Sequence, residues 1–476
     1  MISATSRPLC VDLDGTLIRT DLLVESIFAL LKLNILYVFL LPLWLLKGKA
    51  HLKHQIAVRV DIDASLLPYH GDFLSYLKEE DAKGRRLILA TASNEKFAEA
   101  IALYLGIFHD VLASNATINL SGSRKLERLQ SLFGDGGFDY AGNAMVDLPL
   151  WQKAGQTLLV NPERGVKEAA ERQGAIARVF DDRTDRPLKL YIKALRLHHW
   201  LKNLLVFVPL LMSHRFGDLT LVGQAIVAFL AFGLCASSVY LLNDLLDLPD
   251  DRKHPLKRRR PFAAGSISIV HGAMLIPFLL VAAFSLALLL PVEFLGVLAS
   301  YYIITLAYSL RLKRVALVDV LTLSGLYTIR IIAGAAAVLV VPSFWLLAFS
   351  MFLFLSLALV KRFTEVLAVQ QQNRISTSGR GYITIDLETL SQFGSSSAYM
   401  AVLVLAFYIN SDAVKELYTH PEVIWLLCPL LLYMVTRIWL LARRGEMHED
   451  PVVFIIRDRR SQWLAGIGAI LLWLAL

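Results

Sequence analysis

The C-terminal part of the chain is a succession of long apolar blocks separated by short polar segments. A helix needs about 20 mainly apolar residues to cross a bilayer. From Trp200 onward nine blocks approach that length: 199–213, 221–243, 270–291, 293–310, 316–340, 343–367, 394–410, 422–442 and 461–476. With 56% hydrophobic and only 18% charged residues, the chain is too apolar for a soluble protein of 476 residues. We therefore expect an all-α transmembrane bundle of nine helices over 199–476.

Lysine and arginine residues gather in alternate loops between these blocks. If Trp200 starts on the cytoplasmic side, the inside loops carry nineteen of them, whereas the outside loops show only Arg215 and Lys415. The positive-inside rule then predicts a multi-pass protein of the inner membrane, with the residues before Trp200 in the cytoplasm. The net charge of +8 lies beside the apolar blocks, so anionic lipid or phosphate is the expected partner and nucleic acid is not.

A run of acids followed directly by bases, LLNDLLDLPDDRKHPLKRRRPFAAGSIS, ends the second apolar block. Asn243, Asp244, Asp247 and Asp251 are spaced by one, three and four residues, so on a helix they share one face. Such oxygen ligands suit Mg²⁺. The bases that follow would contact phosphate directly: Arg252, Lys253, His254, Lys257, Arg258 and Arg260. The motif predicts a magnesium-diphosphate site at the membrane edge, and the alternative is a solvated mixed-charge loop.

The form NDxxDxxxD of this motif resembles the first aspartate-rich motif of the UbiA superfamily of intramembrane prenyltransferases, and the resemblance covers about residues 195–476. The segments LRLHHWLKNLLVF, DRKHPLKRRRPFAAG and RRGEMHEDPVVFIIRDRRS look most like the decaprenyl-phosphate phosphoribosyltransferase branch. The resemblance implies a nine-helix bundle that moves phosphoribose from phosphoribosyl diphosphate to a polyprenyl phosphate and releases diphosphate. Asp244, Asp247 and Asp251 would be its catalytic, Mg²⁺-binding residues.

The same resemblance suggests a second, cationic pole. Aromatic prenyltransferases usually carry another aspartate-rich motif after the sixth span, but here that loop begins KRFTEV. Lys361 and Arg362 suit a phosphate-bearing acceptor or a sugar 5-phosphate better than a second magnesium ion. Tyr308 and Lys313, in YSLRLKR, match a Tyr and a Lys of the superfamily and are expected at the phosphate site.

Four further polar residues lie in or beside predicted spans. Lys202 and Asn203, at the start of the first span, are carried over from the resemblance as substrate-binding residues. Asp319 and Arg330 lie about three turns apart on the fifth span. Because ionisable residues inside a span usually face a cavity, we expect this pair to line the active chamber. The alternative is that the two residues merely pair with each other.

The segment RPLCVDLDGTL, residues 7–17, reads as an apolar strand followed by two aspartates and a Gly-Thr turn. Asp12 and Asp14 would then lie at the carboxyl edge of a parallel sheet, where open α/β sheets bind ligands. The run DLDGT resembles the first motif of the haloacid dehalogenase (HAD) superfamily, whose first Asp is a phosphoryl-accepting nucleophile and whose second is a general acid/base. The resemblance, over about residues 5–175, implies an α/β Rossmann-like domain with phosphatase chemistry.

Three later segments match the other motifs of that superfamily in order. RRLILATAS would supply Thr91 as a phosphate-binding hydroxyl, and GSRKLERLQ would supply Lys125 as a charge-stabilising amine. FDYAGNAMVDLPLW matches the acidic GDxxxD motif, but Asn143 replaces its first aspartate and leaves only Asp147 acidic. An amide oxygen still binds Mg²⁺, although the site loses one charge. Both an active phosphatase and a degenerate, structural domain remain open. The expected Mg²⁺ ligands are Asp12, Asp14, Asn143 and Asp147.

The expected organisation is a HAD-like domain over 1–175 with a helical cap over about 20–80, a linker with an interfacial helix over 176–198, and the membrane domain over 199–476. The cap contains the apolar stretch IFALLKLNILYVFLLPLWLLKGKAHLKHQ. A crossing there would separate Asp12 from Thr91 and Lys125. We expect instead cap helices that dip into the membrane interface, or a buried cap core.

Three functions follow from these patterns. The first is phosphoribosyl transfer, after which the HAD-like domain would remove the 5-phosphate of the lipid product. The second is a prenyltransferase that takes a prenyl diphosphate donor and an aromatic or lipid acceptor. The third is a transporter or a non-catalytic scaffold that anchors a phosphatase-like domain, although transporter sites usually lie at mid-membrane.

Overall fold

The computed structural model describes residues 7–183, 187–373, 380–411, 414, 418–447 and 450–475. The chain divides into two compact units. The first contains Met1–Arg196 and Tyr240–Pro277, and the second contains Leu197–Val239 and Phe278–Leu476. The aspartate-rich segment therefore belongs to the same unit as the HAD-like domain.

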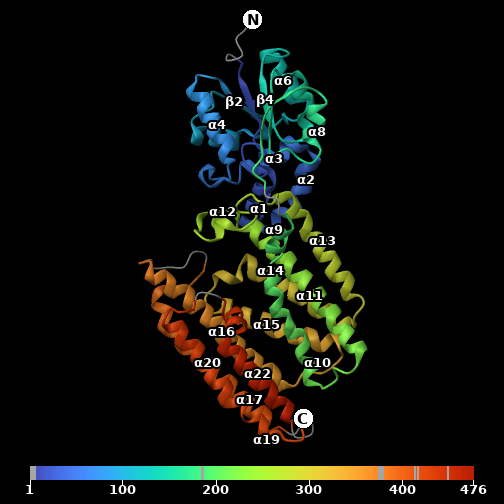
Figure 1. Cartoon of the computed structure of the whole chain (residues 1–476), viewed down its shortest axis with the longest axis vertical. Coiled ribbons are helices and arrows are strands. Elements are labelled where there is room, and N and C mark those ends of the chain that lie inside the picture. Colours follow the sequence, from blue (N-terminus) through green and yellow to red (C-terminus); the bar gives the residue numbers. More distant parts are fainter. Residues whose placement is uncertain are drawn as a thin grey trace. The chain divides into compact units, whose positions relative to one another are not determined.

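The first unit contains a six-stranded parallel sheet with the order β3-β2-β1-β4-β5-β6. Figure 1 labels β2 and β4 of this sheet. Its strands are short and mostly buried, as expected for a parallel sheet. Central strand β1 pairs through Val11 with Leu89 on one side and Ala141 on the other. The carboxyl ends of β1, β2 and β4 therefore meet, and the predicted α/β architecture is confirmed. The strands are β1 Leu9–Val11, β2 Leu87–Asn94, β3 Asp110–Ser114, β4 Asp139–Gly142, β5 Thr157–Val160 and β6 Ile176–Phe180.

Each face of this sheet has its own hydrophobic core, because successive side chains of a strand point to opposite faces. Leu9 and Val11 pack with residues of α4 and α5, such as Phe73 and Phe97. Cys10 belongs to the other core, with residues of α6, α7 and α8. The sheet is therefore covered on both faces. The helices are α4 Gly71–Ala82, α5 Glu95–Leu105, α6 Ser123–Phe133, α7 Leu148–Lys153 and α8 Val166–Glu171.

The cap is inserted between β1 and β2 and consists of α1 Leu22–Leu33, η1 Ile35–Phe39, α2 Leu40–Leu46 and α3 Lys49–Ala57, followed by the short η2 Ala64–Leu66. Only a small core around Leu30 and Ile56 is buried there. Large apolar side chains are exposed in its middle, including Phe39 at 71% and Leu46 at 84%. The cap therefore has a small buried core and an exposed apolar surface, and interfacial insertion stays a prediction.

The remaining elements of the first unit surround the aspartate-rich segment. They are α9 Pro187–Ala194, α12 Leu248–Lys253 and η5 Lys257–Arg259, with η3 Met145–Asp147 at the edge of the sheet. The division between the units falls within α11 Leu219–Leu246 and α13 Ile269–Ala287.

Seven helices of the described residues are long and apolar enough to cross a membrane. They are Leu219–Leu246, Ile269–Ala287, Val292–Leu310, Val318–Ala337, Phe344–Gln371, Thr384–Ile409 and Pro421–Arg443. The chain is thus a multi-pass helical membrane protein, but the predicted count of nine spans is not confirmed. The first predicted span corresponds to Leu197–Met212. It is a 3₁₀ helix over Leu197–Phe207, followed by a short α-helix over Val208–Met212 that includes Pro209. The last, Arg459–Ala475, has only 17 residues and begins with two arginines.

The second unit is built from these helices and shorter ones. Phe354, Leu357 and Trp439 belong to a hydrophobic core shared by α16, α17 and α20. Of the two predicted outside cations, Lys415 lies outside the described residues, so the orientation stays a prediction. The elements are η4 Leu197–Phe207, α10 Val208–Met212, α14 Val292–Leu310, η6 Leu312–Arg314, α15 Val318–Ala337, α16 Phe344–Gln371, η7 Thr384–Asp386, α17 Leu387–Ile409, α19 Pro421–Ile424, α20 Leu427–Arg443, α21 Pro451–Arg457 and α22 Arg459–Ala475.

Candidate active sites

Asp12 follows β1 directly and is the first residue of a buried hydrogen-bonded chain. The Lys125 ammonium donates to Asp12 Oδ1 at 2.8 Å and to the Tyr140 hydroxyl at 3.0 Å. Tyr140 in turn donates to Asp147 Oδ1 at 3.0 Å. Burial alone would lower the pKa of Lys125, but the charges of Asp12 and Asp147 raise it, so the lysine stays charged. The structure thus brings Asp12 and Lys125 together as predicted and adds Tyr140, which the sequence analysis missed.

Asp14 lies at the same sheet edge and accepts two hydrogen bonds. Ser93 donates to its Oδ2 at 2.6 Å, and the Leu22 amide donates to its Oδ1 at 2.8 Å. Burial, the charge of Asp21 and the charge of Asp12 raise the pKa of Asp14 to about 7. A carboxyl group with that pKa can give or take a proton near neutral pH.

The predicted hydroxyl, Thr91, is fully buried, and its Oγ1 accepts the Ser93 amide at 3.0 Å. Ser93, two residues later, is the residue that contacts Asp14. Side chains two apart on a strand point to the same face, so the pair of hydroxyls in ATAS offered two candidates. Ser93 is thus a second candidate hydroxyl at this edge, and phosphate binding by Thr91 stays a prediction.

Each of the four predicted Mg²⁺ ligands already accepts a hydrogen bond within the protein. Asn143 Oδ1 accepts from the Thr16 hydroxyl at 3.2 Å. Asp147 is buried and accepts from the amides of Asn143 and Ala144 as well as from Tyr140. Within the described parts of the chain, no three His, Cys, Asp or Glu side chains are arranged to hold a metal ion. Mg²⁺ binding at the HAD-like site therefore stays a prediction.

The raised pKa of Asp14 gives a prediction for stability. A carboxyl whose pKa rises on folding stabilises the protein below its unfolded pKa, and this contribution is lost as the pH rises toward about 7. Asp14→Asn, which cannot ionise, should therefore gain stability relative to wild type, and more at pH 8 than at pH 5. Thermal unfolding of the purified full chain at both pH values measures this. Asp72→Asn, at an exposed position, is the control. An equal gain at both pH values would contradict the raised pKa.

The aspartate-rich motif lies where α11 ends and α12 begins. The Asp247 amide donates to Asn243 O at 2.9 Å, and the Asp251 amide donates to Asp247 O at 2.8 Å. The predicted four-residue helical spacing therefore persists across the break between the two helices. Asp244 is buried and forms ion pairs with Arg196 and Arg260.

Arg260 also bonds Asp251 Oδ2 at 2.7 Å, so one guanidinium bridges two acids of the motif. Asn243 Oδ1 is buried and makes no hydrogen bond within the described structure. A buried acceptor without a donor, in the same motif as two carboxylates that share a cation, suits a divalent ion. Asn243, Asp244 and Asp251 are the residues that would hold Mg²⁺. Asp247, the third acid of the predicted magnesium site, pairs with Lys32 at 3.1 Å, and a bound ion would take the place of this ammonium.

Lys32 is the last basic residue of α1, in the cap of the HAD-like domain. Its ammonium also contacts Asp250 at 2.8 Å. The two acids raise the pKa of Lys32 against the opposing effect of burial. The HAD-like domain therefore supplies a cation to the aspartate-rich motif, at a sequence separation that no local pattern indicates.

Arg252 does not lie free for phosphate as predicted. Its Nη1 and Nη2 donate to Glu25 of α1 at 2.6 and 3.0 Å, and its Nε donates to Ala263 O at 3.1 Å. Both side chains of the ion pair are 5% exposed. Arg252 is therefore an anchor between the cap and the aspartate-rich loop. Lys257 and Arg258, by contrast, lie exposed in η5.

The predicted residues of the second unit fall into three polar groups. Lys202 and Lys361 both contact Asp450 Oδ2, at 2.8 and 3.1 Å. Although burial opposes it, these two lysines hold the pKa of Asp450 far below its usual range. Asp450 was not singled out in the sequence, where it is one acid within GEMHEDP.

Asp319 and Arg330 belong to the other two groups, one residue in each. Arg330 donates to Asn203 Oδ1 at 3.0 Å and to the Tyr301 hydroxyl at 3.2 Å. Asp319 accepts from Tyr308 at 2.8 Å and forms an ion pair with the fully buried Arg362. Glu365 also pairs with Arg362, and Arg380 contacts both Asp319 and Glu365, so two arginines share two acids at the predicted cationic pole. Lys313, the remaining candidate, is half-buried in η6.

Residues 204–457 match the model of the UbiA prenyltransferase family. The chain belongs to this family. Decaprenyl-phosphate phosphoribosyltransferase of Mycolicibacterium smegmatis is 30% identical over 293 residues, which cover 58% of this chain and 91% of that relative. The uncharacterized protein y4nM of Sinorhizobium fredii is 37% identical over 463 residues, which cover 96% of this chain and 89% of the relative. The y4nM protein is thus similar along both parts of this UbiA-family transferase.

Two solved structures resemble parts of this UbiA-family chain. A UbiA homolog from Archaeoglobus fulgidus, bound to DMAPP and Mg²⁺, has a TM-score of 0.44 at 15% identity and covers 59% of this chain and 96% of its own. Phosphoserine phosphatase in its apo form has a TM-score of 0.27 at 14% identity and covers 39% of this chain and 98% of its own.

The buried Arg252–Glu25 pair leads to a second stability prediction for this UbiA-family protein. Arg252→Met should lower the free energy of unfolding by about 3–5 kcal/mol, because it leaves the Glu25 carboxylate buried without a partner. The double variant Glu25→Leu with Arg252→Met should recover most of that loss. Thermal unfolding of the full chain measures both, and Arg258→Met, at an exposed position, is the control. Equal losses in the single and double variants would contradict the ion-pair role.

Proposed function

We propose that this UbiA-family protein transfers 5-phosphoribose from phosphoribosyl diphosphate to a polyprenyl phosphate at the cytoplasmic face of the membrane. The observation that carries the proposal is the 30% identity to decaprenyl-phosphate phosphoribosyltransferase along nearly the whole length of that relative. The arrangement of Asn243, Asp244 and Asp251 supports it, since these oxygens suit a magnesium-bound diphosphate.

Transfer breaks the bond between the anomeric carbon of ribose and the diphosphate oxygen, so negative charge grows on the leaving group. A bound Mg²⁺ would neutralise part of that charge. Arg260, which already contacts two acids of the motif, and the exposed Lys257 and Arg258 provide donors for diphosphate oxygens. The acceptor phosphate is ionised at neutral pH, so the attack needs no strong general base.

A second activity is supported by the geometry at Asp12 and Asp14. We propose that the HAD-like domain removes the 5-phosphate from the phosphoribosylated lipid. The Asp12 carboxylate attacks phosphorus, the bond from phosphorus to the 5-oxygen breaks, and Asp14 gives its proton to that oxygen. Lys125, 2.8 Å from Asp12, offsets the charge on the transferred group. Water then hydrolyses the aspartyl-phosphate and returns the proton to Asp14.

The choice of donor tests the transferase proposal. Membranes that contain the protein receive polyprenyl phosphate with either labelled phosphoribosyl diphosphate or labelled geranyl diphosphate, and the lipids are extracted. Label in the lipid fraction from phosphoribosyl diphosphate alone is the expected result. Label from geranyl diphosphate alone would replace the proposal with prenyl transfer, the second candidate function.

A further inference from the structure

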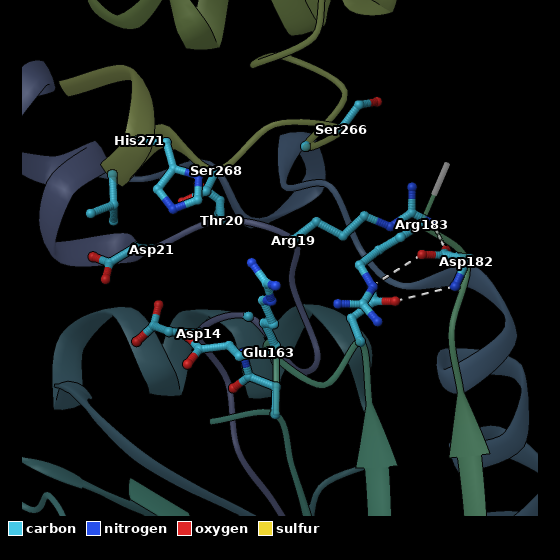
Figure 2. A pocket seen from close by; sticks show the side chains of 16 residues that line it. Asp14, Arg19, Thr20, Asp21, Glu163, Asp182, Arg183, Ser266, Ser268 and His271 are labelled. Carbon is cyan, nitrogen blue, oxygen red and sulfur yellow. Dashed lines mark hydrogen bonds and ion pairs between the residues drawn. The ribbon is translucent and has the colours of Figure 1, made fainter. Parts of the chain in front are cut away.

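A cavity of about 710 Å³ lies within the first unit, between the HAD-like sheet edge and the segment that leads into α13. Asp14 lines it on one side, and Ser266, Ser268 and His271 line it on the other. Figure 2 shows Ser268 and His271 across the cavity from Asp14. Its volume is that of a small-molecule site. The phosphatase-like carboxylate and a loop of the UbiA-family region therefore share one chamber.

The loop wall is held in place by close packing. Gly265 has φ +67°, and a Cβ there would lie 2.6 Å from Arg19 Cβ, so only glycine allows the loop to approach this closely. His271 Nδ1 lies 3.1 Å from the Tyr191 hydroxyl of α9. The buried Arg252–Glu25 pair joins the same loop to the cap, because Arg252 also bonds Ala263 O. The wall is therefore part of the folded unit.

The cavity lining suits a phosphorylated sugar. Arg164 brings positive charge, whereas the other lining arginines pair with acids, Arg19 with Asp182 and Arg183 with Asp181. Asp21 and Glu163 offer acceptors for sugar hydroxyls. Ser266, Ser268 and His271 add neutral donors and acceptors on the loop side. Few apolar residues line the chamber, so it would receive a headgroup and leave a lipid tail outside.

One wall of the cavity is continuous with a helix long and apolar enough to cross a membrane. His271 is the third residue of α13, a helix long and apolar enough to cross a bilayer. On the cap, Lys32 pairs with Asp247, one residue after the end of the membrane helix α11, and the exposed apolar run from Leu33 to Leu46 begins directly after this lysine. The cavity loop therefore adjoins the membrane helix α13, and the cap adjoins the end of the membrane helix α11.

We infer that this cavity takes the phosphorylated sugar headgroup of a membrane-anchored lipid, and that Ser266, Ser268 and His271 determine this specificity for the HAD-like site. The inference rests on the proposed phosphatase activity and adds the binding site of the lipid headgroup and the residues that select it. Reaction at Asp12 requires the phosphate to reach the carboxyl edge of β1, and the loop residues then contact the sugar and the link to the lipid.

The test compares three phosphate esters with the purified full-length protein in lipid vesicles: phosphoribosylated polyprenyl phosphate, ribose 5-phosphate and p-nitrophenyl phosphate. Ser268→Ala combined with His271→Ala should lower the ratio of kcat/KM for the lipid to that for p-nitrophenyl phosphate about tenfold, since it removes hydrogen bonds specific to the lipid headgroup. His51→Ala, a half-buried histidine outside the cavity, is the matched control and should leave this ratio unchanged.

Two results would overturn the inference while leaving the phosphatase proposal intact. One is an unchanged ratio in the loop variant of an enzyme that hydrolyses the lipid. The other is wild-type hydrolysis of ribose 5-phosphate with the same kcat/KM as the lipid, which would assign the cavity to a free sugar phosphate. Absence of phosphate release from all three esters would overturn both the inference and the phosphatase proposal.

Discussion

Asp247→Asn should reduce phosphoribosyl transfer at least about 100-fold, because Asp247 is a predicted ligand of the Mg²⁺ that would neutralise the leaving diphosphate. Among the three acids of the motif, Asp247 is the one whose substitution should destabilise the fold least. Its side chain is 27% exposed, and its partner Lys32 keeps Asp250 as a second partner. Asp244 is 3% exposed between two arginines, so its replacement would leave buried cations unpaired.

Asp250→Asn is the matched control, because Asp250 contacts the same lysine, is 63% exposed and lies outside the NDxxDxxxD spacing. Both variants are measured for labelled lipid in membranes with equal amounts of inserted protein. Full activity of Asp247→Asn would contradict a catalytic role for the motif. Loss of turnover with normal insertion would exclude the transporter or scaffold alternative.

Asp12→Asn should lower phosphate release from the phosphoribosylated lipid more than about 1,000-fold, as expected for loss of a nucleophile. An asparagine can still accept the hydrogen bond from Lys125, so the fold should be retained. Phosphoribosyl transfer should continue in this variant, and the 5-phosphorylated lipid should accumulate. Liberated inorganic phosphate and extracted lipid are measured in the same reaction.

Asp135→Asn, an exposed acid paired with Lys153, is the control for this experiment. Phosphate release that persists in Asp12→Asn would exclude the aspartyl-phosphate mechanism. No release from the wild-type protein would instead indicate that Asn143 marks a domain that has lost its phosphatase activity and serves the transferase through Lys32 and Glu25.

Features that depend on neighbours in the sequence were predictable. The strand before Asp12, the four-residue spacing from Asn243 to Asp251 and the membrane-length helices all follow from local periodicity. The count of spans was less predictable. Apolar length alone did not reveal that the block with Pro209 forms a 3₁₀ helix followed by a short α-helix.

Only the structure showed which of several similar side chains makes a given contact. ATAS offered two hydroxyls on one face of β2, and only the packing of the sheet edge placed Ser93 rather than Thr91 on Asp14. The sequence grouped Arg252 with the other bases of its loop. In the structure its guanidinium pairs with the carboxylate of Glu25, which lies 227 residues earlier in the chain.

The sequence by itself determined which residue types stand at which spacing: two HAD-like aspartates at a strand end, and an asparagine with three aspartates at the end of a membrane helix. Only the tertiary structure decided their partners. Lys32 reaches Asp247 across 215 residues, and Asp14 shares a cavity with His271. Such contacts depend on how separate elements pack, which leaves no periodic trace in the chain, whereas helices and strands repeat their pattern every few residues.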